Sequence, residues 1–288
     1  MTTTHAPTEE TSTMATITSY DVTTEQRPRH AAPNRQPALT AVPGQSFLRL
    51  VRTELRKSVD TRSGRVLLLG ILALALAGIG WRLTHLNDGP VSFEIFIQTS
   101  MTGVQLLLPV IGIMAMTSEW TQRTALTTFT LSPRRVRVQL AKFTAAVVLS
   151  VLVLTAVVAL VAGSTALGGA ISGDQVNWGT AQSGLLDGLS GVYLANALNV
   201  VMGAAMGAVL AQTAIAVVVY FVAPTAWSFA GTALLKSKAD WLDVFGAFGR
   251  IAERDMGGKL PESLTAIAFW IVLPTVLGLW ISSRREVK

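Results

Sequence analysis

The sequence predicts an all-α membrane protein with six transmembrane helices, an amphipathic helix before the first of them, and a helical outer segment before the last. Half of the 288 residues are apolar, only 14% are charged, and the mean hydropathy is +0.48. Soluble domains rarely combine these values. Charged residues are also absent from five runs long enough to span a bilayer. These runs are Val66 to Trp81, Ile95 to Ser118, Phe143 to Gly173, Gly188 to Leu235 and Ser263 to Ser283.

The fourth run must contain two spans, which brings the total to six. Its 48 residues would form a helix of about 72 Å, more than twice the hydrocarbon thickness. The expected hairpin tip is near Gln212 and Thr213. The first span can extend beyond its short run because Arg65 and Arg82 can snorkel, whereas glycines after residue 162 favour an outer loop. Within a membrane domain of residues 66–288, the spans are expected at about 66–81, 96–117, 141–162, 191–211, 214–234 and 264–281.

The first 65 residues contain two segments of different character. Residues 1–45 are rich in Thr and Pro and lack apolar periodicity, which predicts a disordered cytoplasmic tail. Residues 46–65 have the spacing of an amphipathic helix, with Ser46 as its N-cap and with Glu54 and Lys57 outside the apolar stripe. Such a helix is expected in the headgroup plane of the lipid bilayer. It can be a simple membrane anchor, or it can also bind a protein partner.

Two further patterns leave alternatives open. Residues 236–262 carry apolar residues at helical spacing, which indicates either a re-entrant helix or a short helix on the outer surface. Gly203 and Gly207 form a small-xxx-small face that lets another helix approach closely. That helix can belong to the same chain or to a second copy.

The distribution of positive charge predicts that both termini are cytoplasmic. Six Lys or Arg lie between Arg49 and Arg65, five between Arg123 and Lys142, and three after Ser283, whereas residues 83–95 and 163–190 have none. Positive residues mark cytoplasmic loops. The five cations of residues 236–259 oppose this orientation, because they would then lie outside.

Composition disfavours several classes of function. The chain has no Cys and only three His, so neither thiolate nor clustered-histidine metal sites are expected. An ion-coupled transporter would usually bury ionisable groups near the midplane, and an intramembrane enzyme would need a nucleophile with a base, but the span cores carry neither. A membrane scaffold without transport activity stays possible. No GxxxxGK[ST] phosphate loop occurs, so we expect neither ATP hydrolysis nor a cofactor in this chain.

The loop between the second and third spans carries the most specific pattern. It reads SEWTQRTALTTFTLSPRRVRVQLAK from Ser118 to Lys142, and the helix before the first span reads FLRLVRTELRKSVDTRSGR. Together these segments resemble the permease subunits of ABC-2 type ABC transporters. In that family an acidic residue closes the second span, a Thr follows, then Pro and Arg, then a Lys that opens the third span. The matching residues here are Glu119, Thr124, Pro133, Arg134 and Lys142.

The resemblance extends over about residues 46–285, and Arg123 stands where the family commonly has Gly. It implies a multi-pass export permease of the cell membrane whose cytoplasmic loop docks on a separate ATPase subunit, which would bind the ATP. It also implies a second permease subunit, as a homodimer or a heterodimer, and we expect no nucleic-acid partner. The arginines Arg123, Arg134 and Arg135 could form a charged surface for the ATPase together with Glu119. Alternatively, they serve only to retain the loop in the cytoplasm.

Overall fold

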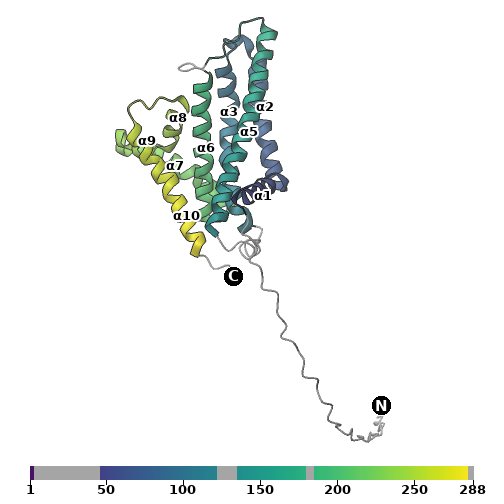
Figure 1. Cartoon of the computed structure of the whole chain (residues 1–288), viewed down its shortest axis with the longest axis vertical. Helices are drawn as coiled ribbons and strands as arrows, with labels where there is room; N and C mark the ends of the chain where they lie inside the picture. Colours follow the sequence, from purple (N-terminus) through teal and green to yellow (C-terminus); the bar gives the residue numbers. More distant parts are fainter. Residues whose placement is uncertain (3–45, 122–134, 180–184, 285–288) are drawn as a thin grey trace, which may run out of the picture. The chain divides into compact units, whose positions relative to one another are not determined.

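The computed structural model describes residues 1–2, 46–121, 135–179 and 185–284. Contacts divide the chain into residues 1–44 and 45–288, and every described helix belongs to the second unit. The described residues are almost entirely helical, and six helices are long and apolar enough to cross a membrane. The protein is therefore an all-α, multi-pass membrane protein (Figure 1). Its long helices are α2 (Arg62–Thr84), α3 (Phe93–Thr121), α5 (Arg135–Ser172), α6 (Leu185–Leu210) and α7 (Thr213–Leu235), and its last span joins α9 (Leu260–Ile267), η3 (Ala268–Val272) and α10 (Leu273–Arg284).

Two helix boundaries differ in how well the sequence predicts them. The helices α6 and α7 break at Ala211, which has a positive φ of 55°, and Gln212; this is within a residue of the expected tip. The prediction of an outer loop after residue 162 was wrong, because α5 continues to Ser172. Gly168 and Gly169 are packing positions: a β carbon on Gly168 would lie 3.2 Å from both Leu86 and Phe96, and one on Gly169 would overlap Val176. Close approach to the neighbouring segment thus keeps this glycine-containing turn helical.

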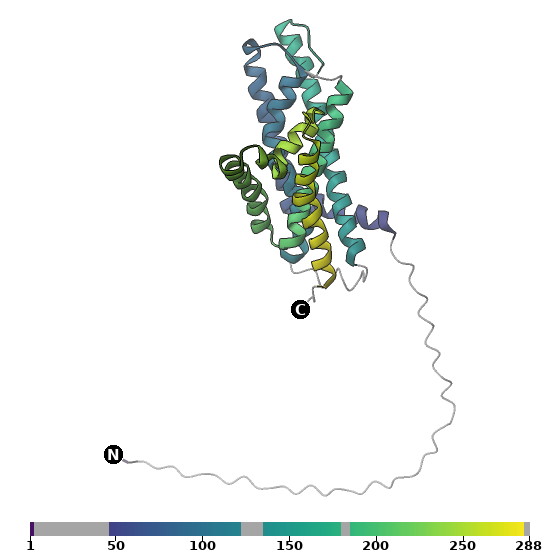
Figure 2. The same cartoon turned by 90° about the vertical axis from the view of Figure 1, so that its left-hand side faces the viewer.

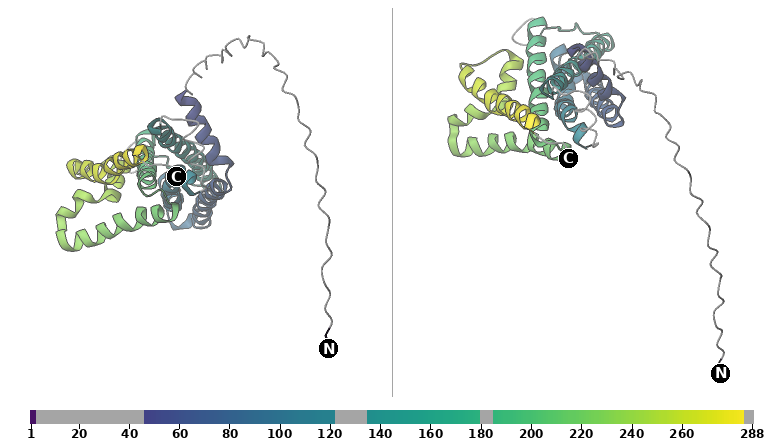
Figure 3. Two further views of the ribbon diagram at one scale, coloured as in Figure 1. Left: turned by 90° about the horizontal axis from the view of Figure 1, so that it is seen from below. Right: turned by 60° about the horizontal axis from the view of Figure 1, so that its bottom comes forward.

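The N-terminal helix α1 (Phe47–Asp60) runs across the long helices at one end of the bundle (Figures 1 and 3). The Ser46 hydroxyl accepts a hydrogen bond from the Arg49 amide, as expected of an N-cap. The apolar stripe does not face lipid along its whole length, because Val51 is buried against α5 whereas Leu48 is 77% exposed. Glu54 lies outside the apolar stripe but does not face the surroundings. It is buried at 8% exposure, because a charge partner lies inside the bundle.

The helix α3 packs against α2, α5 and α6, and its contact with α6 is the most extensive among the described helices. Figure 2 shows the long helices side by side in one bundle. Gly203 and Gly207 of α6 lie in this contact. A β carbon on Gly203 would overlap the carbonyl oxygen of Pro109, and one on Gly207 would lie 2.9 Å from that of Ile113. The small-residue face is therefore used within the chain, where missing side chains let two backbones meet.

The short helix α8 (Val244–Glu253) packs against α6 and buries Val244, Ala247 and Phe248. Its residues Phe245 and Phe248 line one pocket together with Gln105 and Asn199, which lie near the middles of α3 and α6. Two indole groups satisfy carbonyls of the segment that leads into α8. Trp227 donates to Ala239 at 3.1 Å and Trp270 to Leu242 at 2.8 Å. A re-entrant segment would require such hydrogen bonds from the surrounding protein.

Arg82 does not snorkel, contrary to the sequence-based expectation. Its side chain turns inward and is 3% exposed. The guanidinium donates to the carbonyls of His85, Gly89 and Pro90, and it lies 5.5 Å from the ring centroid of Phe96. Carbonyl groups of the loop between α2 and α3 compensate the buried charge of Arg82. The arginine therefore stabilises the conformation of this loop.

Candidate functional site

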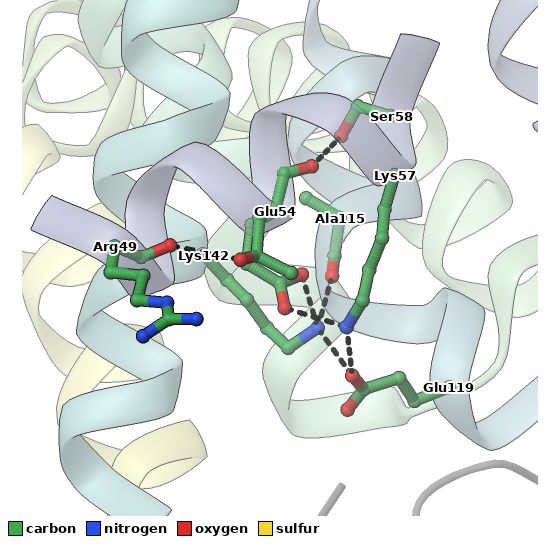
Figure 4. A network of polar contacts seen from close by, with 8 residues as sticks. Arg49, Glu54, Lys57, Ser58, Ala115, Glu119 and Lys142 are labelled. Carbon is green, nitrogen blue, oxygen red and sulfur yellow. Dashed lines mark hydrogen bonds and ion pairs between the residues drawn. The ribbon is translucent and has the colours of Figure 1, made fainter. Parts of the chain in front are cut away.

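Four charged side chains from three helices meet at the end of the bundle where α1 lies. Glu54 and Lys57 come from α1, Glu119 from the last turn of α3, and Lys142 from the second turn of α5. Figure 4 shows the two ammonium groups between the two carboxylates. We call these four residues the charge cluster. Their formal charges balance, because two carboxylates face two lysines.

Each lysine of the charge cluster contacts both carboxylates. Lys57 Nζ lies 2.8 Å from Glu54 Oε1 and 3.2 Å from Glu119 Oε1. Lys142 Nζ lies 2.9 Å from Glu54 Oε2 and 3.1 Å from Glu119 Oε1. The cluster is therefore a continuous network that ties α1 to α3 and α5. Moving α1 alone would break contacts to both other helices.

The two lysines differ in burial. The side chain of Lys142 is 1% exposed, and its ammonium also donates to the Ala115 carbonyl at 3.3 Å. All three of its donors are thus used. The side chain of Lys57 is 47% exposed. Burial alone would lower the pKa of Lys57, but the hydrogen bond and charge of Glu54, with those of Glu119, outweigh it and raise that pKa above its ordinary value.

The structure treats the residues that match the permease family pattern, and the arginines expected to face the ATPase, in different ways. The structure brings Glu119 and Lys142 together with Glu54 and Lys57, a grouping that sequence spacing did not indicate. Glu119 does not form a partner-facing surface, because it is 6% exposed and turned toward α1 and α5. Arg135 begins α5 and is half-buried. Arg123, Thr124, Pro133 and Arg134 lie outside the described residues.

A second polar region lies deeper, between α3, α6, α7 and α8, around a pocket of about 410 Å³. The buried hydroxyl of Tyr220 donates to Asn199 Oδ1, and Asn196 Nδ2 donates to the Val192 carbonyl at 2.8 Å. No residue that lines this pocket is ionisable at neutral pH. Sequence reasoning missed Tyr220. A polar hydroxyl within a long apolar run was the available signal, because such a group needs a partner in the membrane.

In the part of the chain that the structure describes, no group of three or more His, Asp or Glu side chains could hold a metal ion. The chemistry available at the charge cluster is ion pairing between helices. Comparisons with protein families, with curated proteins and with solved structures find no match to this chain. The charge cluster is therefore interpreted from its own geometry.

Proposed function

We propose that this protein is the membrane-spanning permease subunit of an ABC-type exporter, driven by ATP that a separate ATPase subunit binds and hydrolyses. The observation that carries the proposal is the charge cluster. It links an amphipathic helix at the end of the bundle to α3 and α5, the two helices that flank residues 122–134. This is the connection that an exporter needs between a partner outside the membrane and its membrane helices.

The distribution of the charge cluster over three helices supports a mechanical role. A partner that displaces α1 or the loop between α3 and α5 would also have to move Glu119 and Lys142, because they are bonded across the three helices. Buried ion pairs hold their geometry strictly, since breaking one leaves an uncompensated charge. Displacement at the loop would therefore reach α3, and through its close contact with Gly203 and Gly207 it would reach α6. These helices would carry the rearrangement for transport.

A complete exporter of this kind requires an assembly and an orientation. Six spans would form half of the pathway, so a second permease, identical or different, would complete it, and both termini would face the cytoplasm of a cell-membrane exporter. Cysteines introduced singly at Ser283 and Asn177 test the orientation, since the chain has none of its own. The first should react with a membrane-impermeant thiol reagent only in opened cells, and the second in intact cells. The reverse pattern would exclude the proposed cytoplasmic loop.

Purification from native membranes in mild detergent tests the partner directly. We expect an ATPase subunit with a phosphate-binding loop to co-purify in about equal amount with the permease. Recovery of this chain alone or with other membrane proteins only, under conditions that preserve known exporter complexes, would contradict the proposal and favour a scaffold.

Arg135 offers a finer test with a matched control. If its guanidinium docks the ATPase, Arg135→Glu should abolish co-purification and Arg135→Lys should weaken it by about tenfold, because Lys lacks the planar fork. The control is Arg137→Lys, which makes the same change two positions farther along α5. If arginine only retains the loop in the cytoplasm, all Lys variants should behave like the wild type.

A further inference from the structure

A pocket of about 330 Å³ lies beside the charge cluster, between α1, α2, α3 and α5. Its lining changes along the bundle. Near α1 it is polar, with Lys57, Ser58 and Ser118 beside the two carboxylates. Farther from that end it is apolar. The apolar lining residues are Leu67, Leu68, Ile111, Met114 and Leu149.

The pocket is open to its surroundings and is not an enclosed cavity. Leu68 and Met114 in its wall are only half-buried, and beside them Val66 and Leu69 of α2 are 69% and 63% exposed. In a protein that crosses a bilayer, such exposed apolar residues contact lipid chains. A molecule that fills the apolar part of this pocket, close to these lipid-facing residues of α2, is therefore itself partly apolar.

One cation at the polar end retains hydrogen-bonding capacity. An ammonium group has three donors. Lys142 uses all of them on Glu54, Glu119 and the Ala115 carbonyl. Lys57 uses two, on the same carboxylates, in the described structure. Its third donor and its exposed half face the surroundings, where an acceptor can reach it.

We propose that this pocket binds one membrane phospholipid, with the phosphate on Lys57 and the first part of an acyl chain against the apolar residues. The order of the lining matches the order of a lipid, since the polar end lies at the bundle end where α1 crosses and the apolar end lies deeper. A small free anion fits less well, because it would leave the apolar part of the pocket unfilled. The lipid would pack against both α1 and α2 and stabilise their relative position. Such a site would exist whether or not the protein is an exporter.

Native mass spectrometry of the purified full chain tests the site with two lipids of identical chains. Phosphatidylglycerol carries the phosphate, and diacylglycerol lacks it. We expect one saturable adduct, with phosphatidylglycerol bound about fivefold more tightly, as is typical of one cation near an anionic headgroup. Equal affinity for the two lipids would overturn the proposal. So would displacement of phosphatidylglycerol by inorganic phosphate, which would indicate a simple anion site.

Matched variants separate the site from general charge and hydrophobicity. Lys57→Gln should remove the preference for phosphatidylglycerol, whereas Arg56→Gln should keep it. The second variant deletes the same charge from a neighbouring side chain that is 84% exposed. Leu68→Trp should fill the apolar end and weaken both lipids by roughly tenfold, whereas Leu69→Trp, on the exposed face, should not.

Two outcomes with these variants would contradict the proposal. If the Lys57→Gln variant still prefers phosphatidylglycerol to diacylglycerol, Lys57 does not bind the phosphate. If the Leu68→Trp and Leu69→Trp variants bind lipid equally well, the lipid does not occupy the pocket. Thermal unfolding of each variant identifies any loss that is due to misfolding. Co-purification of an ATPase is measured separately, so failure of the lipid site and failure of the exporter proposal are distinguishable.

Discussion

The charge cluster and the deeper pocket use polar groups in opposite ways. The charge cluster places four ionised groups at the end of the bundle, where each is paired across helices. The deeper pocket contains only neutral polar groups, such as the hydrogen-bonded pair of Tyr220 and Asn199. The cost of burying an ion rises steeply with distance from water, whereas a neutral pair needs only one good hydrogen bond. Depth therefore accounts for the chemistry of each region.

The two regions also differ in strength and adaptability. Ion pairs bind three helices into one geometry, and loss of a partner leaves a buried charge. A neutral hydrogen bond costs less to break, so the region around α8 can rearrange more easily. Measurements of stability test this contrast, and the expected losses decrease from the buried ion to the half-exposed one.

Replacement of Lys142 by Met should have the largest effect. It leaves two buried carboxylates with one half-exposed cation, and removal of one partner from a buried ion pair costs about 3 to 5 kcal/mol. Thermal unfolding in detergent measures the loss. The double variant Glu54→Gln with Lys142→Met restores charge balance and should recover part of the stability. If the double variant is no more stable than the single one, pairing across the helices is not what Lys142 contributes.

Gly203→Ala should destabilise the contact between α3 and α6 by about 1 to 3 kcal/mol, because the added methyl group overlaps a backbone carbonyl that cannot move aside. Gly163→Ala is the control, since a β carbon there meets nothing within 4 Å. In the middle of a helix that substitution should stabilise by about 0.5 to 1 kcal/mol. Unfolding temperatures that shift in the same direction for both variants would contradict the close packing.

Tyr220→Phe should cost about 1 kcal/mol, since it removes one buried neutral hydrogen bond and leaves Asn199 Oδ1 without that donor. Tyr193→Phe is a matched control, because its hydroxyl pairs with Thr155 at an exposed position, and it should cost less. The expected cost is several times smaller than that of Lys142→Met. Similar unfolding temperatures for the Tyr220 and Lys142 variants would show that the neutral hydrogen bond and the buried ion pair contribute equally to stability, which contradicts the proposed difference between the regions.

Lys57→Met should have the smallest effect, about 0 to 1 kcal/mol, because water screens a half-exposed ion pair. The pKa of Lys57 is raised in the folded protein, so its contribution is fully present below its ordinary pKa of 10.5 and is lost as the pH rises through the folded value. The stability difference between wild type and variant should therefore stay constant from roughly pH 7 to 9. A difference that disappears within this range would contradict the raised pKa.

The fold class and the number of spans could be predicted from the amino-acid sequence without any coordinates. Uncharged runs of these lengths have no other stable place than a bilayer, and 48 residues without charge have to fold back on themselves, which α6 and α7 do at Ala211 and Gln212. The N-cap at Ser46 was predicted correctly as well. These features are local: each depends on the composition or hydrogen bonding of one segment, and such information is complete in the sequence.

Which charges meet, in contrast, depends on the packing of distant segments. Glu54 and Lys142 are 88 positions apart and are bonded at 2.9 Å, whereas amphipathic spacing alone placed Glu54 only outside the apolar stripe. A helical pattern defines the faces of a helix, but it does not say which neighbour covers each face. Burial of Arg82, the packing of α8 against α6 and the contact of Gly203 with α3 depend on the same long-range packing. Ionised groups in a membrane bundle are stable only beside a partner, and the partner's position is set by how all the helices pack together.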